Sequence, residues 1–174
     1  MEIFFTILIY ALSLLWGWLG WNQIINYRRN KSKVNIINGI SYLFAAILTI
    51  NSSNWTTLFL YLGAYFIIPL VSTLFSFTFL PILFLLKNKK VKYQIICFFR
   101  GSLYGSVSIL LYFVIVMIFR FDYDFIVLSI IFVSCLLNNL QRIVAKEDKE
   151  KENEKFIMSG ELISLIIGST IILL

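Results

Sequence analysis

The sequence predicts an all-α integral membrane protein: a single domain over residues 1–174, built as a bundle of about six transmembrane helices. Hydrophobic residues make up 60% of the chain and charged residues only 14%, and the mean hydropathy is +0.88. A soluble domain is about half apolar and a quarter charged, because water must wet its surface. The few charges here also gather in short clusters between long apolar runs. Both observations indicate a chain that spans a membrane.

Six apolar runs can be considered as spans, since about 20 apolar residues cross a bilayer core of about 30 Å. The runs cover about residues 3–20, 34–50, 55–86, 93–119, 125–140 and 156–174. Because the basic clusters at 28–33 and 87–92 should lie on one side of the membrane, run 55–86 must cross it once or three times, and about 32 residues are too few for three crossings. We therefore expect one span, kinked at Pro69 or extending past the interface beyond Pro81. A charged linker at 141–155 follows the fifth run.

The basic clusters predict an orientation. Residues 28–33 and 87–92 each carry four positive charges and no negative one, so both should face the cytoplasm or an organelle matrix. The N-terminus then lies outside, and with six spans the C-terminus does too. If run 125–140 does not cross, the chain has five spans and the linker lies outside.

The sequence lacks most residue types and motifs that form catalytic and metal-binding sites. There is no His, the common general base and metal ligand, and Cys97 and Cys135 lie too far apart for a CxxC motif. No catalytic signature is found, so we expect no enzyme activity, no catalytic residues, no metal site and no cofactor. The net charge of +6 comes from residues that flank apolar runs, which argues against nucleic acid as a partner.

Two ionisable residues within the runs, Arg100 and Glu161, are candidate functional residues, because a charge at membrane depth is costly. There are structural alternatives to a functional role. The long Arg100 side chain could reach the membrane interface, and Glu161 could lie near a helix N-terminus, where the helix dipole favours a negative charge. Each residue adjoins a face of small side chains of the kind through which membrane helices pack closely. These candidate packing residues are Gly101, Gly105, Gly160, Ser164 and Gly168. We expect runs 93–119 and 156–174 to pack through them, with Arg100 and Glu161 paired at the cytoplasmic end.

Two short tracts carry a resemblance to a known family. Tyr61-Leu62-Gly63-Ala64 resembles the Tyr-x-Gly-Ala stretch of the sixth membrane subunit of respiratory complex I, and Glu161-Leu162-Ile163-Ser164 resembles the Glu-Leu-x-Ser of its last span. The tracts cover eight of 174 residues. Pro69 and the basic cluster at 28–33 depart from the family pattern, which has typically five spans. The resemblance implies a subunit of a large redox assembly.

These observations favour a non-catalytic subunit or accessory protein of a membrane assembly, such as an immunity or secretion accessory protein. A small carrier or channel component and the complex I subunit are the alternatives. The expected partners are the lipid bilayer and other membrane proteins. The expected location is a membrane crossed several times, either the bacterial cytoplasmic membrane or an organelle inner membrane.

Overall fold

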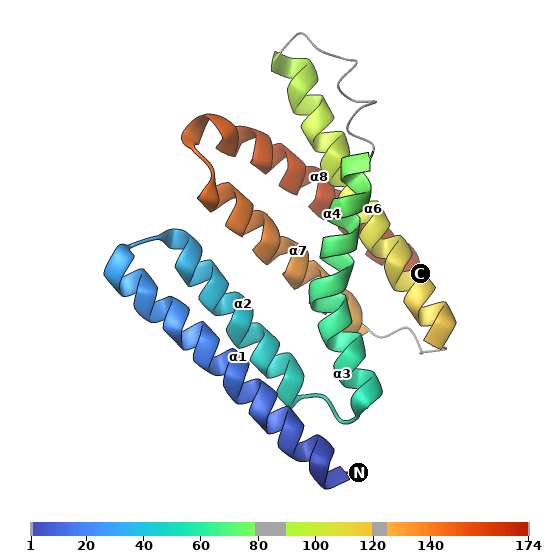
Figure 1. Cartoon of the computed structure of the whole chain (residues 1–174). Coiled ribbons are helices and arrows are strands. Elements are labelled where there is room, and N and C mark those ends of the chain that lie inside the picture. Colours follow the sequence, from blue (N-terminus) through green and yellow to red (C-terminus); the bar gives the residue numbers. More distant parts are fainter. Residues whose placement is uncertain (1, 79–89, 120–124, 174) are drawn as a thin grey trace. The chain divides into compact units, whose positions relative to one another are not determined.

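The computed structural model describes residues 2–78, 90–119 and 125–173, and all regular structure in these ranges is helical (Figure 1). The elements are α1 (Glu2–Asn30), α2 (Lys33–Ile50), α3 (Trp55–Leu62), the π-helical η1 (Gly63–Ile67), α4 (Ile68–Thr78), α6 (Lys90–Phe119), α7 (Phe125–Ala145) and α8 (Asp148–Leu173). Six stretches of these helices are long and apolar enough to cross a membrane, as the sequence predicts. The chain divides into two compact units, Met1–Tyr65 and Phe66–Leu174.

In the first unit, α1 and α2 form an antiparallel hairpin with a turn of two residues (Figure 1). The helices approach closely where Gly20 faces Gly39, because a Cβ on Gly20 would lie 3.0 Å from the Gly39 carbonyl oxygen. Trp16 stacks on Tyr42 on the same side of the hairpin. Small residues at a crossing let backbones approach, which favours helix association in lipid. Sequence analysis did not identify this glycine pair.

The third apolar run continues as a helix through Thr78, with a change of hydrogen-bond pattern in its middle. Asn54 caps α3 by accepting a hydrogen bond from the Thr57 amide at 2.8 Å. The π-helical segment η1 ends immediately before the residue that precedes Pro69. Proline lacks the amide that an α-helix would use there, so a local change of pattern beside Pro69 has a physical cause. Pro81 lies outside the described residues.

In the second unit, α6 and α8 run parallel and α7 runs antiparallel to both. Gly101 faces Ile157 and Gly105 faces Glu161, so the contacts advance in the same direction along α6 and α8. Helix α4 packs against α6 and α7. The interior of this unit is formed by large side chains of the three long helices, including Tyr104, Tyr112, Ile131 and Leu165.

Most of the expected linker at 141–155 is helical. Helix α7 continues to Ala145 and α8 already begins at Asp148, so only Lys146 and Glu147 connect them. Lys146 Nζ lies 2.8 Å from the Glu150 carboxylate, and this hydrogen bond raises the pKa of the exposed lysine. The charged segment extends the helices because neighbouring residues of opposite sign stabilise an exposed turn.

Candidate functional site

The candidate site is a buried polar cluster where α7 and α8 face each other. Glu161 on α8 is 2% exposed. Its Oε2 atom accepts a hydrogen bond from Asn139 Nδ2 at 2.7 Å and lies 3.4 Å from Arg142 Nη2. Asn139 and Arg142 stand three residues apart on α7, so they lie on one face of the helix. Because α7 and α8 are joined by two residues, they place this face directly against Glu161.

Asn139 links the other two side chains of the cluster. Its Oδ1 atom accepts a hydrogen bond from Arg142 Nη2 at 2.7 Å, while its Nδ2 atom donates to Glu161 and to the Cys135 carbonyl. The amide is therefore oriented with its oxygen toward the cation and its nitrogen toward the carboxylate. A buried carboxylate is tolerated only when charge and hydrogen bonds compensate it, and this arrangement supplies both.

Helix α6 contributes Tyr104, which connects the cluster to a second arginine. The Tyr104 ring lies 5.2 Å from Arg142 Cζ and 5.5 Å from Arg100 Cζ. Arg100 Nε also donates a hydrogen bond of 2.8 Å to the Tyr104 hydroxyl. Cations over an aromatic ring are stabilised by its quadrupole, so one buried tyrosine supports both guanidinium groups.

A narrow polar extension leads from the cluster deeper into the unit. Cys135 is fully buried one turn before Asn139, and its carbonyl oxygen accepts a hydrogen bond from Asn139 Nδ2 at 2.9 Å. The Ser108 hydroxyl on α6 lies 4.0 Å from the Cys135 sulfur. Within the described ranges, no group of three His, Cys, Asp or Glu residues could hold a metal ion. These side chains form contacts with one another and supply no metal-binding set there.

All five candidate packing residues lie at the contact between α6 and α8. A Cβ on Gly101 would collide with the Ile157 carbonyl, and one on Gly160 would collide with the Phe98 carbonyl. On Gly105, a Cβ would lie 2.5 Å from the Glu161 carbonyl oxygen and 2.8 Å from Ser164 Cβ. Gly168 faces Ile109. The backbones therefore touch along this face, and the contact positions Glu161 beside α6.

The structure gives the two charged candidates different partners. Glu161 binds Asn139 and Arg142, and Arg100 binds Tyr104. The two residues are connected through the Tyr104 ring, which both arginines contact. A direct pair between Arg100 and Glu161 stays a prediction.

Sequence analysis missed Tyr104, Asn139 and Arg142. By composition the fifth run ends at Leu140 and Arg142 belongs to the linker, because an arginine after an apolar run usually marks the interface. The available signal was the spacing of Asn139 and Arg142, two polar residues three positions apart on a helix that continues to Ala145. Tyr104 stands four residues after Arg100 and could have been found in the same way.

In this cluster the negative charge of Glu161 is compensated inside the helical bundle. The carboxylate is bound on one side by the Asn139 amide and the Arg142 guanidinium. Helix α8, which carries the carboxylate, is in backbone contact with α6. Arg142 Nε is buried without a hydrogen-bond partner in the described part of the chain, while the whole side chain remains 22% exposed. The cluster thus extends from the interior toward the surface at one end of the bundle. No family model, curated protein or solved structure matches this chain.

Proposed function

We propose that this chain is a non-catalytic membrane protein that acts as a subunit or accessory protein of a larger membrane assembly. The single observation that carries this proposal is the internal pairing of Glu161 with Asn139 and Arg142. A carrier needs polar groups that exchange partners with its cargo, whereas a scaffold needs them bound to one another. In this bundle the carboxylate is bound by protein groups on a neighbouring helix.

The backbone contact between α6 and α8 supports the same proposal. Helices that meet through Gly101 and Gly160 leave no space for a solute between them. Helix α1, by contrast, exposes many large apolar side chains that lipid or another membrane helix must cover in the assembled state. They include Ile3, Phe4, Ile7, Tyr10, Leu14, Trp18 and Trp21. We expect part of this apolar surface to contact partner helices.

The test is co-purification of the tagged chain, expressed at native level, in a mild detergent, with co-eluting chains identified by mass spectrometry. The proposal expects a stoichiometric membrane partner. Gly105→Leu should lose that partner, because its side chain would meet the Glu161 backbone. Gly17→Leu is the comparison variant: a Cβ there has no atom within 4 Å, so it leaves the α6–α8 contact intact and should lose the partner only if the partner binds this part of α1. Redox subunits among the partners would replace the accessory role by that of a complex I subunit.

A carrier is the second candidate, favoured by the polar contacts that lead from Glu161 through Asn139 and Cys135 to Ser108. Its test is a flux measurement in liposomes with the purified chain and with Glu161→Gln. A monodisperse chain that has no partner and shows flux lost in Glu161→Gln would overturn the subunit proposal.

A further inference from the structure

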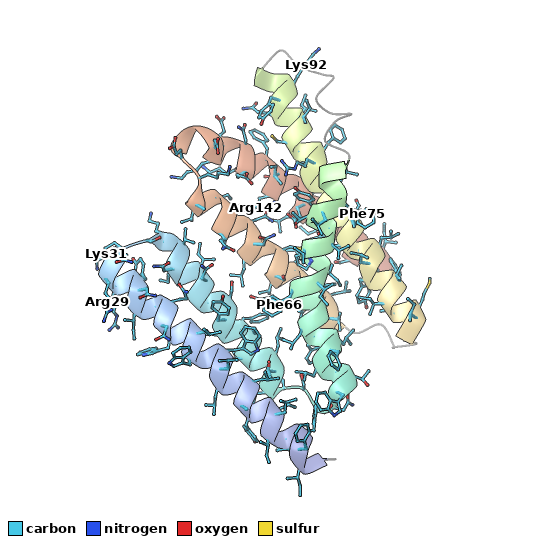
Figure 2. The ribbon with its side chains drawn as sticks, in the orientation of Figure 1. Arg29, Lys31, Phe66, Phe75, Lys92 and Arg142 are labelled. Atoms are coloured by element: carbon cyan, nitrogen blue, oxygen red, sulfur yellow. The ribbon has the colours of Figure 1, made fainter. Side chains whose placement is uncertain are left out.

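The turn between α1 and α2 presents four cations on a small, exposed surface. Arg28 and Arg29 lie in the last turn of α1, Lys31 lies in the connecting turn, and Lys33 begins α2. All four are exposed. Figure 2 shows Arg29 and Lys31 at the closed end of the hairpin. We call these four residues the basic turn.

The basic turn has no acidic neighbours within its unit. The only acidic residue in Met1–Tyr65 is Glu2, at the opposite end of a helix of 29 residues. At 1.5 Å per residue, Glu2 is about 40 Å away along the axis of α1. None of the four cations forms an ion pair within the described part of the chain. Their charge is therefore available to an external anion.

The backbone holds this charge in place at a conformational cost. Lys31 has a φ of 53°, a left-handed conformation that a lysine rarely adopts and that glycine or asparagine adopts more easily. The Lys31 amide donates to the Tyr27 carbonyl at 2.8 Å, and the Asn35 amide donates to the Ser32 carbonyl at 3.0 Å. These bonds close a two-residue turn. A cation at the strained position is a feature that packing alone does not require.

Apolar and aromatic surface adjoins the basic turn. Trp18 and Trp21 are exposed on α1, and Trp21 precedes Arg28 by seven residues, about 10 Å along the axis. Exposed tryptophans followed by cations match the two layers of a membrane surface, with rings at the interface and positive charge at headgroup level. A partner in free solution would match the charge but not the adjoining aromatic surface.

We propose that the basic turn is a binding site for the phosphate headgroups of anionic phospholipids. The ligand is a phosphate monoanion or dianion that is presented at the membrane surface. Arg28 and Arg29 donate hydrogen bonds to its oxygens, and Lys31 and Lys33 supply point charges. The apolar sides of α1 and α2 contact the acyl chains of the same lipids.

The test uses the four tryptophans of the chain, Trp16, Trp18, Trp21 and Trp55, all of which lie in the first unit. The full chain is reconstituted in dioleoylphosphatidylcholine vesicles containing an increasing fraction of dibrominated phosphatidylglycerol. Dibrominated phosphatidylcholine serves as the neutral quencher. Quenching of tryptophan fluorescence then gives the relative affinity for the anionic lipid. We expect a clear preference for it, weakened by salt as the Debye length falls from about 10 Å at 0.1 M to about 3 Å at 1 M.

The variant Arg28→Gln/Arg29→Gln/Lys31→Asn should remove most of this preference. Each cation near an anionic surface contributes about a fivefold change in affinity, so three of them set an upper limit of about a hundredfold. Asparagine tolerates the left-handed conformation of residue 31, so the turn should remain folded. The matched control is Lys146→Gln/Lys151→Gln/Lys155→Gln, which removes three positive charges from a segment that also carries acidic residues.

Equal quenching by the anionic and neutral lipids in the wild-type chain would overturn the proposal. The same holds if both triple variants lose the preference equally, because net charge would then be the cause. A third contrary result is loss of the preference when sodium phosphate replaces sodium chloride at equal ionic strength. That outcome would assign the basic turn to free phosphate.

Discussion

Asn139 Nδ2 lies 2.7 Å from Glu161 Oε2, and the same amide accepts a hydrogen bond from Arg142 through its Oδ1 atom. One neutral side chain thereby joins a cation and an anion whose own separation is 3.4 Å. This relationship explains how a carboxylate can stand inside an apolar bundle. It also predicts that the three residues contribute to stability as a unit.

Glu161→Ala and Arg142→Ala should each destabilise the folded bundle, and the double variant should lose less than the sum. Removing one partner of a buried pair leaves the other charge uncompensated. A double-mutant cycle, measured by unfolding in mixed micelles, should give a coupling energy of about 1–3 kcal/mol. Additive losses would show that the two charges act independently.

Tyr104→Phe should cost less than Tyr104→Leu. The phenylalanine keeps a ring beneath both guanidinium groups and loses only the hydroxyl that binds Arg100. We expect a loss of about 1–3 kcal/mol for the hydrogen bond to a charged group. Leucine removes the ring as well, with a further loss of about 0.5–2 kcal/mol from the two cation–π contacts. Thermal unfolding in one detergent compares both variants, and equal losses would contradict a role for the ring.

Gly101→Ala should separate α6 from α8, because its methyl group would collide with the Ile157 carbonyl. The expected destabilisation is about 1–3 kcal/mol, typical of overpacking at a close contact. Gly17→Ala is the control: nothing lies within 4 Å of the added carbon, and alanine favours the helix. If both variants unfold at the same temperature as the wild-type chain, the two helices are not in backbone contact.

Asn54→Ala should loosen the start of α3. The Asn54 side chain accepts hydrogen bonds from the Thr57 amide at 2.8 Å and from its hydroxyl at 2.6 Å. Loss of such a cap costs about 0.5–2 kcal/mol. Hydrogen exchange at the Thr57 amide should accelerate accordingly. Asn51→Ala, which alters a neighbouring polar side chain that does not cap α3, should leave this rate unchanged.

Six crossings would place Lys31 and Lys146 on one side of the membrane and Ser53 on the other. Single cysteines at these positions, probed with a membrane-impermeant thiol reagent, test this arrangement. The native Cys97 and Cys135 are buried and should not react, so the unsubstituted chain provides the background. Labelling of position 146 from the same side as position 53 would contradict six crossings.

The apolar runs predicted the helices well because the length and hydropathy of a span are properties of single segments. The third run was also interpreted as one helix, and Pro69 marked the region where η1 departs from the α-helical pattern. Its π-helical geometry could not be derived, since hydrogen-bond register depends on packing around the proline. The end of α7 was placed five residues early, because composition alone cannot show that charged residues continue a helix.

For the candidate site too, the sequence indicated some of the residues but not their partners. Glu161 was found because it is a charge within an apolar run, and the glycines of α6 and α8 were found because small residues recur at helical spacing. The partners Asn139 and Arg142 could not be assigned, because pairing depends on how two helices align. The glycine pair Gly20 and Gly39 was missed because neither glycine has another small residue four positions away on its helix.

The two-residue connection between α7 and α8 also bears on how two helices of this length and hydropathy would enter a bilayer. Glu161 alone would have to leave water as an uncompensated charge, which is costly. Arg142 precedes it by 19 residues and faces it across the hairpin, so both charges can cross from water to lipid as a neutral pair. Helix α6 precedes the hairpin in the chain and offers it a glycine-lined surface. We therefore expect α7 and α8 to enter a bilayer together, as one event.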